Sequence, residues 1–258
     1  MSVYAVNGKE PVAAWIPSLD TSGNGTTTLT DLVGSNNGTL TNMDAATDWV
    51  ADTDAGGVRA LEFDGSGDRI AFSATPRFSS GDTDATLSLW VKLAAGFPDF
   101  NAIFFQSASP YGPSDATVQI DYRNSTSRFR FVTFNASTAT ILNAATFGAA
   151  SADVWYFLVC GYNASTNTMS ISVDAGTPNT VGSAATLNSV ANVQAIGQQL
   201  GSSRYLKGRI DDVRMFDSLL DAADIAYLYN SGSGRGRVAS GVQARRRMSA
   251  QKLIQGVF

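Results

Sequence analysis

The chain has 258 residues, of which 44% are hydrophobic and 16% are charged, and its formal net charge is −4 at pH 7. This length and hydrophobic content are sufficient for one large domain with a complete core. No apolar run is long enough to span a membrane, so we do not expect membrane insertion. The chain has no histidine and one cysteine, Cys160, which excludes His-dependent catalysis, His-ligated metals and an internal disulfide.

Charge is distributed unevenly along the chain. Residues 1–230 carry 12 basic and 22 acidic side chains, a net charge of −10, whereas residues 231–258 carry six basic side chains and no acidic one. This asymmetry predicts that the C-terminal segment docks onto an acidic partner. Nucleic acid and the acidic body of a neighbouring copy both fit that description.

Short runs in which apolar and polar residues alternate, separated by turns rich in Gly and Asn, predict β-strands along most of the chain. Within 86–93, Leu87 and Leu89 share one face and Trp90 lies on the other. Residues 155–159 are apolar on both faces, as in a strand that is covered on both sides. In chain order we expect strands at 11–16, 58–63, 69–73, 86–93, 102–106, 117–122, 129–134, 155–162, 168–173, 193–196 and 206–216.

One short helix follows the last of these strands. Asp221 is a suitable N-cap, and Asp224 lies three residues further on. The apolar residues Ile225 and Leu228 recur at helical spacing and can pack on a sheet, together with Tyr229. Gly232 is the expected terminator.

Several motifs occur in an order that resembles the laminin-G-like jelly rolls of the concanavalin A-like lectin/glucanase superfamily. They comprise the early Asp…Asn-Gly-Thr-Leu turn (31–40), Leu-Glu-Phe-Asp-Gly (61–65), Trp-Val-Lys (90–92), the strand that begins with Trp (155), Val-Asp-Ala-Gly (173–176) and the ending Gly-Arg-Ile-Asp-Asp-Val (208–213) with its helix. The resemblance covers residues 11–232 and leaves an N-terminal arm, 1–10, and a basic tail, 233–258. It implies an all-β, two-sheet antiparallel β-sandwich, the concanavalin A-like jelly roll, with one short C-terminal helix.

The resemblance also sets expectations for function. Most members of this superfamily are carbohydrate-binding, adhesive or protein-binding modules, and a minority are glycoside hydrolases. Hydrolysis needs two carboxylates about 5–10 Å apart, and the hydrolases of this superfamily carry a Glu-x-Asp-x-x-Glu strand. That strand is absent, and the only glutamates are Glu10 and Glu62. We therefore predict a non-enzymatic protein, with a divergent glycosidase as a distant alternative.

Many relatives hold a structural calcium ion near the edge of the sandwich. By position, the resemblance implies Ca²⁺ ligands at Asp20 or Asp31, with Asn37 nearby, and at Asp211, since calcium prefers carboxylate and carbonyl oxygens. Because neighbouring residues of a strand point to opposite faces, only one of Asp211 and Asp212 can serve a given site. The alternative is that these Asp side chains accept hydrogen bonds from loop N–H groups and cap turns.

Aromatic residues in loops are the expected glycan contacts, because sugars bind to exposed aromatic faces together with planar polar side chains. Phe97, Phe100 and Tyr111 are the candidates, and the alternative is that they cover a sheet edge. Trp90 and Trp155 are expected in the core.

The basic tail combines charge with apolar anchors and predicts an assembly role. The residues expected to dock are Arg245, Arg246, Arg247, Leu253, Ile254 and Phe258. The N-terminus shows no basic stretch followed by an apolar one, so no secretory signal is expected. We therefore predict a bacteriophage virion component (a capsid-decoration, head-fibre or tail protein) that forms a homo-oligomer and carries a lectin-like, glycan-binding face. The alternative is an exported, extracellular carbohydrate-binding or adhesion module.

Overall fold

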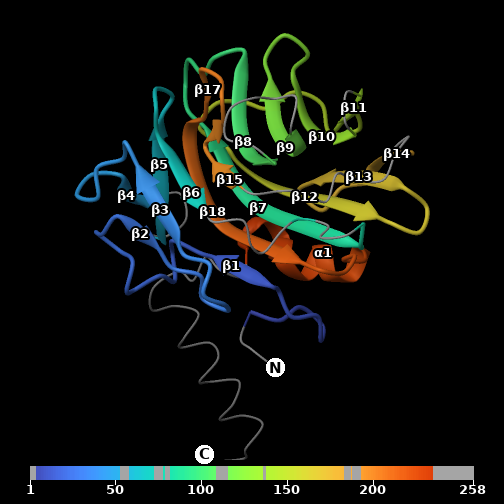
Figure 1. Cartoon of the computed structure of the whole chain (residues 1–258), viewed down its shortest axis with the longest axis horizontal. Helices are drawn as coiled ribbons and strands as arrows, with labels where there is room; N and C mark the ends of the chain where they lie inside the picture. Colours follow the sequence, from blue (N-terminus) through green and yellow to red (C-terminus); the bar gives the residue numbers. More distant parts are fainter. Residues whose placement is uncertain are drawn as a thin grey trace, which may run out of the picture.

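The computed structural model describes residues 4–52, 58–72, 78, 82–108, 116–135, 138–182, 187 and 193–234. In this part of the chain two antiparallel β-sheets lie face to face, and one short α-helix lies against the outer face of one of them (Figure 1). The predicted fold class, a two-sheet sandwich with a C-terminal helix, is confirmed.

The first sheet carries the helix. Its strand order is β14-β13-β12-β7-β18-β5-β4, and β1 also pairs with β18. All of its pairings are antiparallel. The strands are β1 (Ala13–Trp15), β4 (Trp49–Asp52), β5 (Val58–Asp64), β7 (Ala85–Leu93), β12 (Trp155–Asn163), β13 (Thr168–Val173), β14 (Asn179–Gly182) and β18 (Lys207–Phe216).

The second sheet has the order β11-β10-β9-β8-β15-β6-β3-β2. Its strands are β2 (Thr28–Leu29), β3 (Gly38–Thr41), β6 (Arg69–Phe72), β8 (Phe100–Ser107), β9 (Ala116–Arg123), β10 (Arg128–Asn135), β11 (Thr138–Asn143) and β15 (Val193–Ile196). A separate two-stranded hairpin, β16 (Gln198–Gln199) and β17 (Arg204–Tyr205), lies against β8.

Each strand expected from the sequence occurs close to its predicted bounds. The strands that were not expected are β2, β3, β4, β11, β14, β16 and β17. Most of these have two to four residues, which is too short for an alternating pattern to register. The exception is β11, which has six residues, is largely exposed at an edge of the second sheet and does not alternate strictly between apolar and polar residues.

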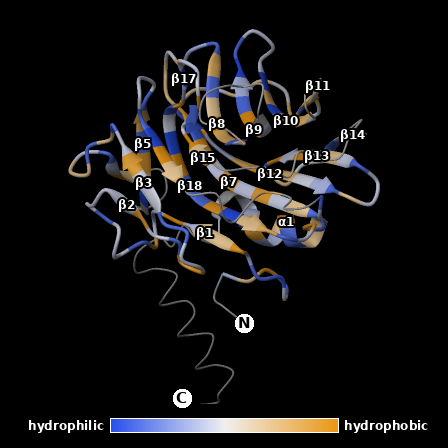
Figure 2. Ribbon diagram, in the orientation of Figure 1, coloured by the Kyte–Doolittle hydropathy of each residue, from blue (hydrophilic) through white to orange (hydrophobic). Residues whose placement is uncertain are grey.

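Alternation along the strands builds the core between the sheets. Leu87, Leu89 and Val91 of β7 face the second sheet and are at most 1% exposed. Figure 2 shows the corresponding bands of hydrophobic and hydrophilic residues along the strands. Cys160 of β12 lies in the same core, and burial raises the pKa of its thiol, so it acts as a small apolar residue.

A second apolar cluster covers the outer face of the first sheet, under α1 (Ala222–Tyr229). Trp90 and Phe157 lie side by side there, and the ring of Tyr229 stacks on both, with centroids 5.9 and 6.1 Å away. Val6 of the N-terminal arm is fully buried in the same cluster. The expectations that Trp90 is a core residue and that the strand from Trp155 is covered on both faces are therefore confirmed.

The helix begins with the predicted cap. The carboxylate of Asp221 accepts a hydrogen bond from the Asp224 N–H at 2.9 Å, and the Asp224 carboxylate accepts one from the Asp221 N–H at 3.0 Å. Asp224 also accepts hydrogen bonds from Asn7 Nδ2 and Lys9 Nζ, so one buried carboxylate ties the N-terminal arm to the helix.

The end of the helix differs from the prediction. Asn230, with φ 49°, is the left-handed C-cap, and Ser231 is also left-handed, so the helix ends before Gly232. Asparagine can take this conformation because its short polar side chain bonds locally, and Asn230 Nδ2 donates to the carbonyl of Gly234. Among the described residues, no helix is long and apolar enough to cross a membrane.

Replacing Asp224 tests the link between the arm and the helix. We expect Asp224→Ala to lower the free energy of unfolding by about 2 kcal/mol, because it removes a cap and leaves buried donors without their acceptor. Denaturant unfolding at pH 7 measures the loss. Asp217→Ala is the matched control, since Asp217 is an exposed carboxylate near the same helix.

The effect of Asp224→Ala should depend on pH. Burial alone would raise the pKa of Asp224, but hydrogen bonds from Lys9, Asp221 and Asn7 outweigh it and lower the pKa. A carboxyl group whose folded pKa lies below its unfolded value stabilises the fold above that unfolded value, and the contribution is lost as the pH falls through the folded pKa. Wild type and variant should therefore converge in acid, and a constant difference down to pH 2 would contradict this.

Candidate functional site

Asp20, one of the predicted calcium ligands, lies in the loop after β1. Its side chain is fully buried. One of its oxygens accepts hydrogen bonds from the Gly23 N–H and the Ser22 hydroxyl, and the other accepts one from the Thr30 N–H at 2.6 Å. The turn closes so tightly that a Cβ at Gly23 would lie 2.2 Å from the carboxylate. Asp20 therefore organises the loop between β1 and β2.

The other three predicted ligands are also hydrogen-bonded to the loops. Asp31 accepts from the N–H groups of Ala14, Val33 and Asn36, and Asn37 Oδ1 accepts from the Asp31 N–H. Asp211 Oδ1 accepts from the Ser18 N–H at 3.3 Å. No group of three or more acidic or Cys side chains that could hold a metal ion occurs among the residues the structure describes. The hydrogen bonds favour the turn-capping alternative, and calcium binding stays a prediction of the resemblance.

Asp212 departs from simple strand alternation. Its φ is 48°, and the register of β18 on β7 shifts between Asp211 and Arg214, which marks a β-bulge. Both Asp212 oxygens bind the Arg214 guanidinium, at 2.6 and 3.1 Å, and Arg214 in turn donates to the carbonyl of Tyr4. The rule that adjacent strand residues point to opposite faces therefore does not hold at this point.

The predicted glycan-binding aromatics have different surroundings. Phe97 is half-buried, packs against the core and makes an edge contact with Tyr122 at 5.4 Å, as expected of a residue that covers a sheet edge. Tyr111 lies outside the described residues. Phe100, at the start of β8, lies among arginine side chains on the outer face of the second sheet.

Three guanidinium groups surround the Phe100 ring. Their central carbons lie 4.0 Å (Arg204), 4.4 Å (Arg123) and 5.1 Å (Arg130) from its centroid. Cations are attracted to the negative face of an aromatic ring, and Arg can stack on it through its planar group. We call Phe100 and these three arginines the Phe100 cluster.

Strand register brings the Phe100 cluster together. Phe100 of β8 pairs with Arg123 of β9, and Asp121, two residues earlier on β9, pairs with Arg130 of β10. Alternate residues of β9 and β10, such as Tyr122 and Phe129, point into the core, so the arginines between them point outward. These arginines were not expected at a site from the sequence. The alternation within β9 and β10 predicts that these arginines lie on the polar face of each strand. It does not predict that they lie close together, because that depends on which strands pair and in which register.

Two carboxylates hold the cluster in place. Arg130 binds the buried Asp121 through two hydrogen bonds, at 2.7 and 2.9 Å, and Gln119 Nε2 donates to the same carboxylate. Burial raises the pKa of Asp121, and the bonds from Arg130 oppose that rise. The exposed Asp99 lies 3.1 Å from Arg123. Two of the three guanidinium groups are therefore held by carboxylates, and the cluster presents a surface of N–H donors.

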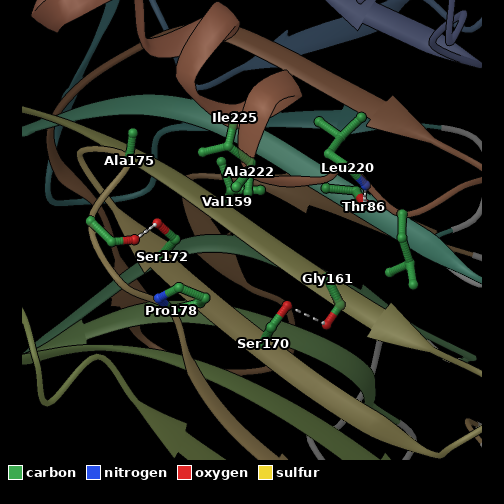
Figure 3. Close-up of a pocket in the computed structure, with 12 residues that line it drawn as sticks. Thr86, Val159, Gly161, Ser170, Ser172, Ala175, Pro178, Leu220, Ala222 and Ile225 are labelled. Atoms are coloured by element: carbon green, nitrogen blue, oxygen red, sulfur yellow. Dashed lines mark hydrogen bonds between the residues drawn. The ribbon is translucent and has the colours of Figure 1, made fainter.

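A separate hollow of about 160 Å³ lies between α1 and the outer face of β12 and β13 (Figure 3). Ser172 donates to the carbonyl of Gly176 at 2.8 Å, and Ser170 to that of Gly161 at 3.5 Å. Thr86 donates to the carbonyl of Ser218. None of the lining side chains is charged, so this hollow offers no acid or base for catalysis.

The residues expected to dock in an assembly lie outside the part of the chain that the structure describes. They are Arg245, Arg246, Arg247, Leu253, Ile254 and Phe258.

The sequence model of the Concanavalin A-like lectin/glucanases superfamily matches residues 64–226, which is more than half of the chain. The chain belongs to this superfamily. No curated protein matches it in sequence.

Several solved structures have the same fold as this chain. The binding domain of botulinum neurotoxin serotype D is 13% identical, with a TM-score of 0.63, over 87% of this chain and 52% of that one. Domain 4 of an extracellular arabinanase from Geobacillus stearothermophilus, solved with arabinotriose, is 15% identical, with a TM-score of 0.62, over 84% and 97%. Trypanosoma rangeli sialidase is 15% identical, with a TM-score of 0.58, over 86% and 33%. The chain thus spans about half of the neurotoxin domain, and at these identities the likeness shows the fold.

Removing the Asp20 carboxylate tests its role in the loop. We expect Asp20→Ala to lower the free energy of unfolding by about 2 kcal/mol in EDTA, because buried N–H donors lose their acceptor without any metal being present. Asp44→Ala is the control, since Asp44 also caps a turn, through the Ala46 N–H, but is exposed. Equal losses in the two variants would contradict the special role of Asp20.

The calcium prediction has its own measurement. A melting temperature that is higher in millimolar calcium than in EDTA, with the rise lost in Asp211→Asn, would support a metal site. The same melting temperature in both buffers would assign these carboxylates to hydrogen bonding alone.

Proposed function

We propose that this protein is a non-enzymatic, glycan-binding jelly roll and that the Phe100 cluster is its glycan-contacting surface. The observation that carries the proposal is the group of three guanidiniums held within 5.1 Å of one ring on an outer face of the sandwich. Planar N–H donors fixed by neighbouring side chains suit the hydroxyl-rich edges of sugars. The outer face of the first sheet, by contrast, is covered by α1 and the N-terminal arm.

The comparisons support this choice of ligand class. The arabinanase domain was solved in complex with arabinotriose, and the ligand-binding domain of botulinum neurotoxin serotype D, which is 11% identical with a TM-score of 0.61, was solved in complex with N-acetylneuraminic acid. Sugar binding by domains of the same fold supports the same ligand class for this chain.

A binding role without catalysis agrees with the side chains present. The sequence has two glutamates and no histidine, and the hollow beside α1 has no charged lining residue. Glycoside hydrolysis requires a pair of carboxylates on opposite sides of the scissile bond. Asp121 is held by Arg130, and burial removes it from solvent, so it is poorly placed to act in such a pair.

A glycan array probed with the full chain tests the proposal. We expect Phe100→Ala to weaken binding to the retained glycans about tenfold, because the guanidinium groups lose the ring that positions them. Phe134→Ala is the matched control, since Phe134 is also a half-buried phenylalanine of the second sheet. Retention of no glycan, or an equal loss in both variants, would refute the proposed function.

A second proposal is assembly into a virion through residues 233–258, with export as an extracellular module as the alternative. The observation that favours assembly is the contrast between the body, with a net charge of −10, and a segment that carries six basic residues and no acidic one. Opposite charges of this size on one chain favour association between copies. A homo-oligomer would be the simplest product.

Light scattering after size exclusion measures this association. We expect the full chain to form an oligomer that becomes monomeric after deletion of residues 235–258 or in high salt, since screening weakens contacts between exposed charges. A full-length monomer at low salt would contradict the assembly role without affecting glycan binding.

A further inference from the structure

We infer that the Phe100 cluster selects acidic glycans, meaning sugar chains that carry carboxylate or sulfate groups. This inference rests on the proposed function and names the ligand class of the same site. It derives from how the ring is covered, from the charges at the cluster and from the net charge of the rest of the body.

The Phe100 ring does not offer the surface that a neutral sugar needs. A sugar ring stacks its C–H groups on an open aromatic face, but guanidinium groups lie 4.0 and 4.4 Å from the Phe100 centroid, and a third lies at 5.1 Å. The ring therefore acts as a support for cations. The cluster presents to a ligand a set of charged N–H donors, and an arginine can pair with a carboxylate through two parallel hydrogen bonds.

The positive charges at this surface exceed the negative ones beside them. Arg130 is neutralised by the buried Asp121, and Arg123 is partly neutralised by the exposed Asp99. Arg204 is exposed and uses Nη1 to donate to the neutral Gln199 Oε1 at 2.8 Å. Its remaining N–H groups form the forked donor that matches a carboxylate or a sulfate.

A like-charge pair adds to this excess. Arg128 lies directly opposite Arg123 in the pairing of β9 and β10. Like charges that face each other across a sheet destabilise it. An anionic group bound over these two side chains on the face of the sheet would relieve that repulsion, so the arrangement favours an acidic ligand over a neutral one.

The surrounding charge limits the kind of anion. Arg123, Arg128, Arg130 and Arg204 are four of only 12 basic residues in residues 1–230, which carry 22 acidic ones. The net negative charge of the rest of the body confines the attraction for an anion to this local surface. Acidic groups spaced along a sugar chain fit a local positive surface of this size.

Matched polysaccharide pairs test the inference with the full chain. The probes are polygalacturonate against its methyl ester, which removes the carboxylate charge, and dextran sulfate against dextran. We expect the charged member of at least one pair to bind at least tenfold more tightly in calorimetry. We also expect Arg128→Gln/Arg204→Gln to abolish that preference without lowering the melting temperature, because the change also removes the like charge opposite Arg123.

Two controls separate this surface from other basic residues. Arg59→Gln removes an exposed arginine from the first sheet, and Arg245→Gln/Arg246→Gln removes two charges from the C-terminal segment. Both variants should keep the preference for the charged probes. Loss of the preference in the C-terminal variant, with retention in Arg128→Gln/Arg204→Gln, would overturn the inference.

The remaining outcomes distinguish the inference from the proposed function. Equal binding of the charged and neutral members would refute selection of acidic glycans and leave glycan binding standing. Binding of only one charged probe, lost in Arg128→Gln/Arg204→Gln, would identify the acidic group as carboxylate or sulfate. Binding of none of the four probes, together with an empty glycan array, would refute both.

Discussion

The hydrogen-bond ladder of β18 is the constraint on which the rest of the structure depends. On one side β18 pairs with β7, and on the other it pairs first with β5 and then with β1. Gly208 allows the closest approach, since a Cβ there would lie 2.1 Å from the Lys92 carbonyl. The bulge after Asp211 carries a buried Asp212–Arg214 ion pair that also holds Tyr4. One strand thereby fixes the first sheet, the early loops and the N-terminal arm.

The two outer faces of the sandwich have opposite characters because the helix and the arm both pack on the first sheet. There they bury Trp90, Phe157 and Val6, so that face adds to stability. On the second sheet, outward residues such as Arg123 and Arg130 keep their charge near solvent, held by carboxylates and an aromatic ring. On the proposed function, the glycan-contacting surface therefore lies on the sheet that the helix and the arm leave uncovered.

The sequence predicted most of the fold because alternation and turn residues are local signals. The apolar face of β7, the doubly covered β12 and the Asp221 cap each depend on a few adjacent residues. The short β2 and β4 carry too few residues for such a signal, and the helix ends at Asn230 because a left-handed Asn served in place of the expected glycine.

The candidate site was less predictable for a physical reason. Phe100 could be selected as an aromatic near a loop, but Arg123 meets it through the register of β8 and β9, and Arg204 through the hairpin that lies against β8. Likewise, the carboxylates of Asp20 and Asp31 could be placed in loops, whereas their hydrogen-bond partners depend on how those loops close. Pairing between strands that are distant in the sequence is the part of the structure that local sequence patterns do not predict.

The contact between the N-terminal arm and the helix determines which face of the domain would point away from a scaffold attached at either end. Asn7 and Lys9 bind Asp224, more than 200 positions away in sequence, so the first and last described segments leave the domain on the same face. A scaffold attached near either end would hold the domain from the side of the first sheet. The arginines around Phe100 would then project outward from every copy, and an array of such copies could engage a repetitive sugar polymer at many points at once, with avidity well above the affinity of one domain.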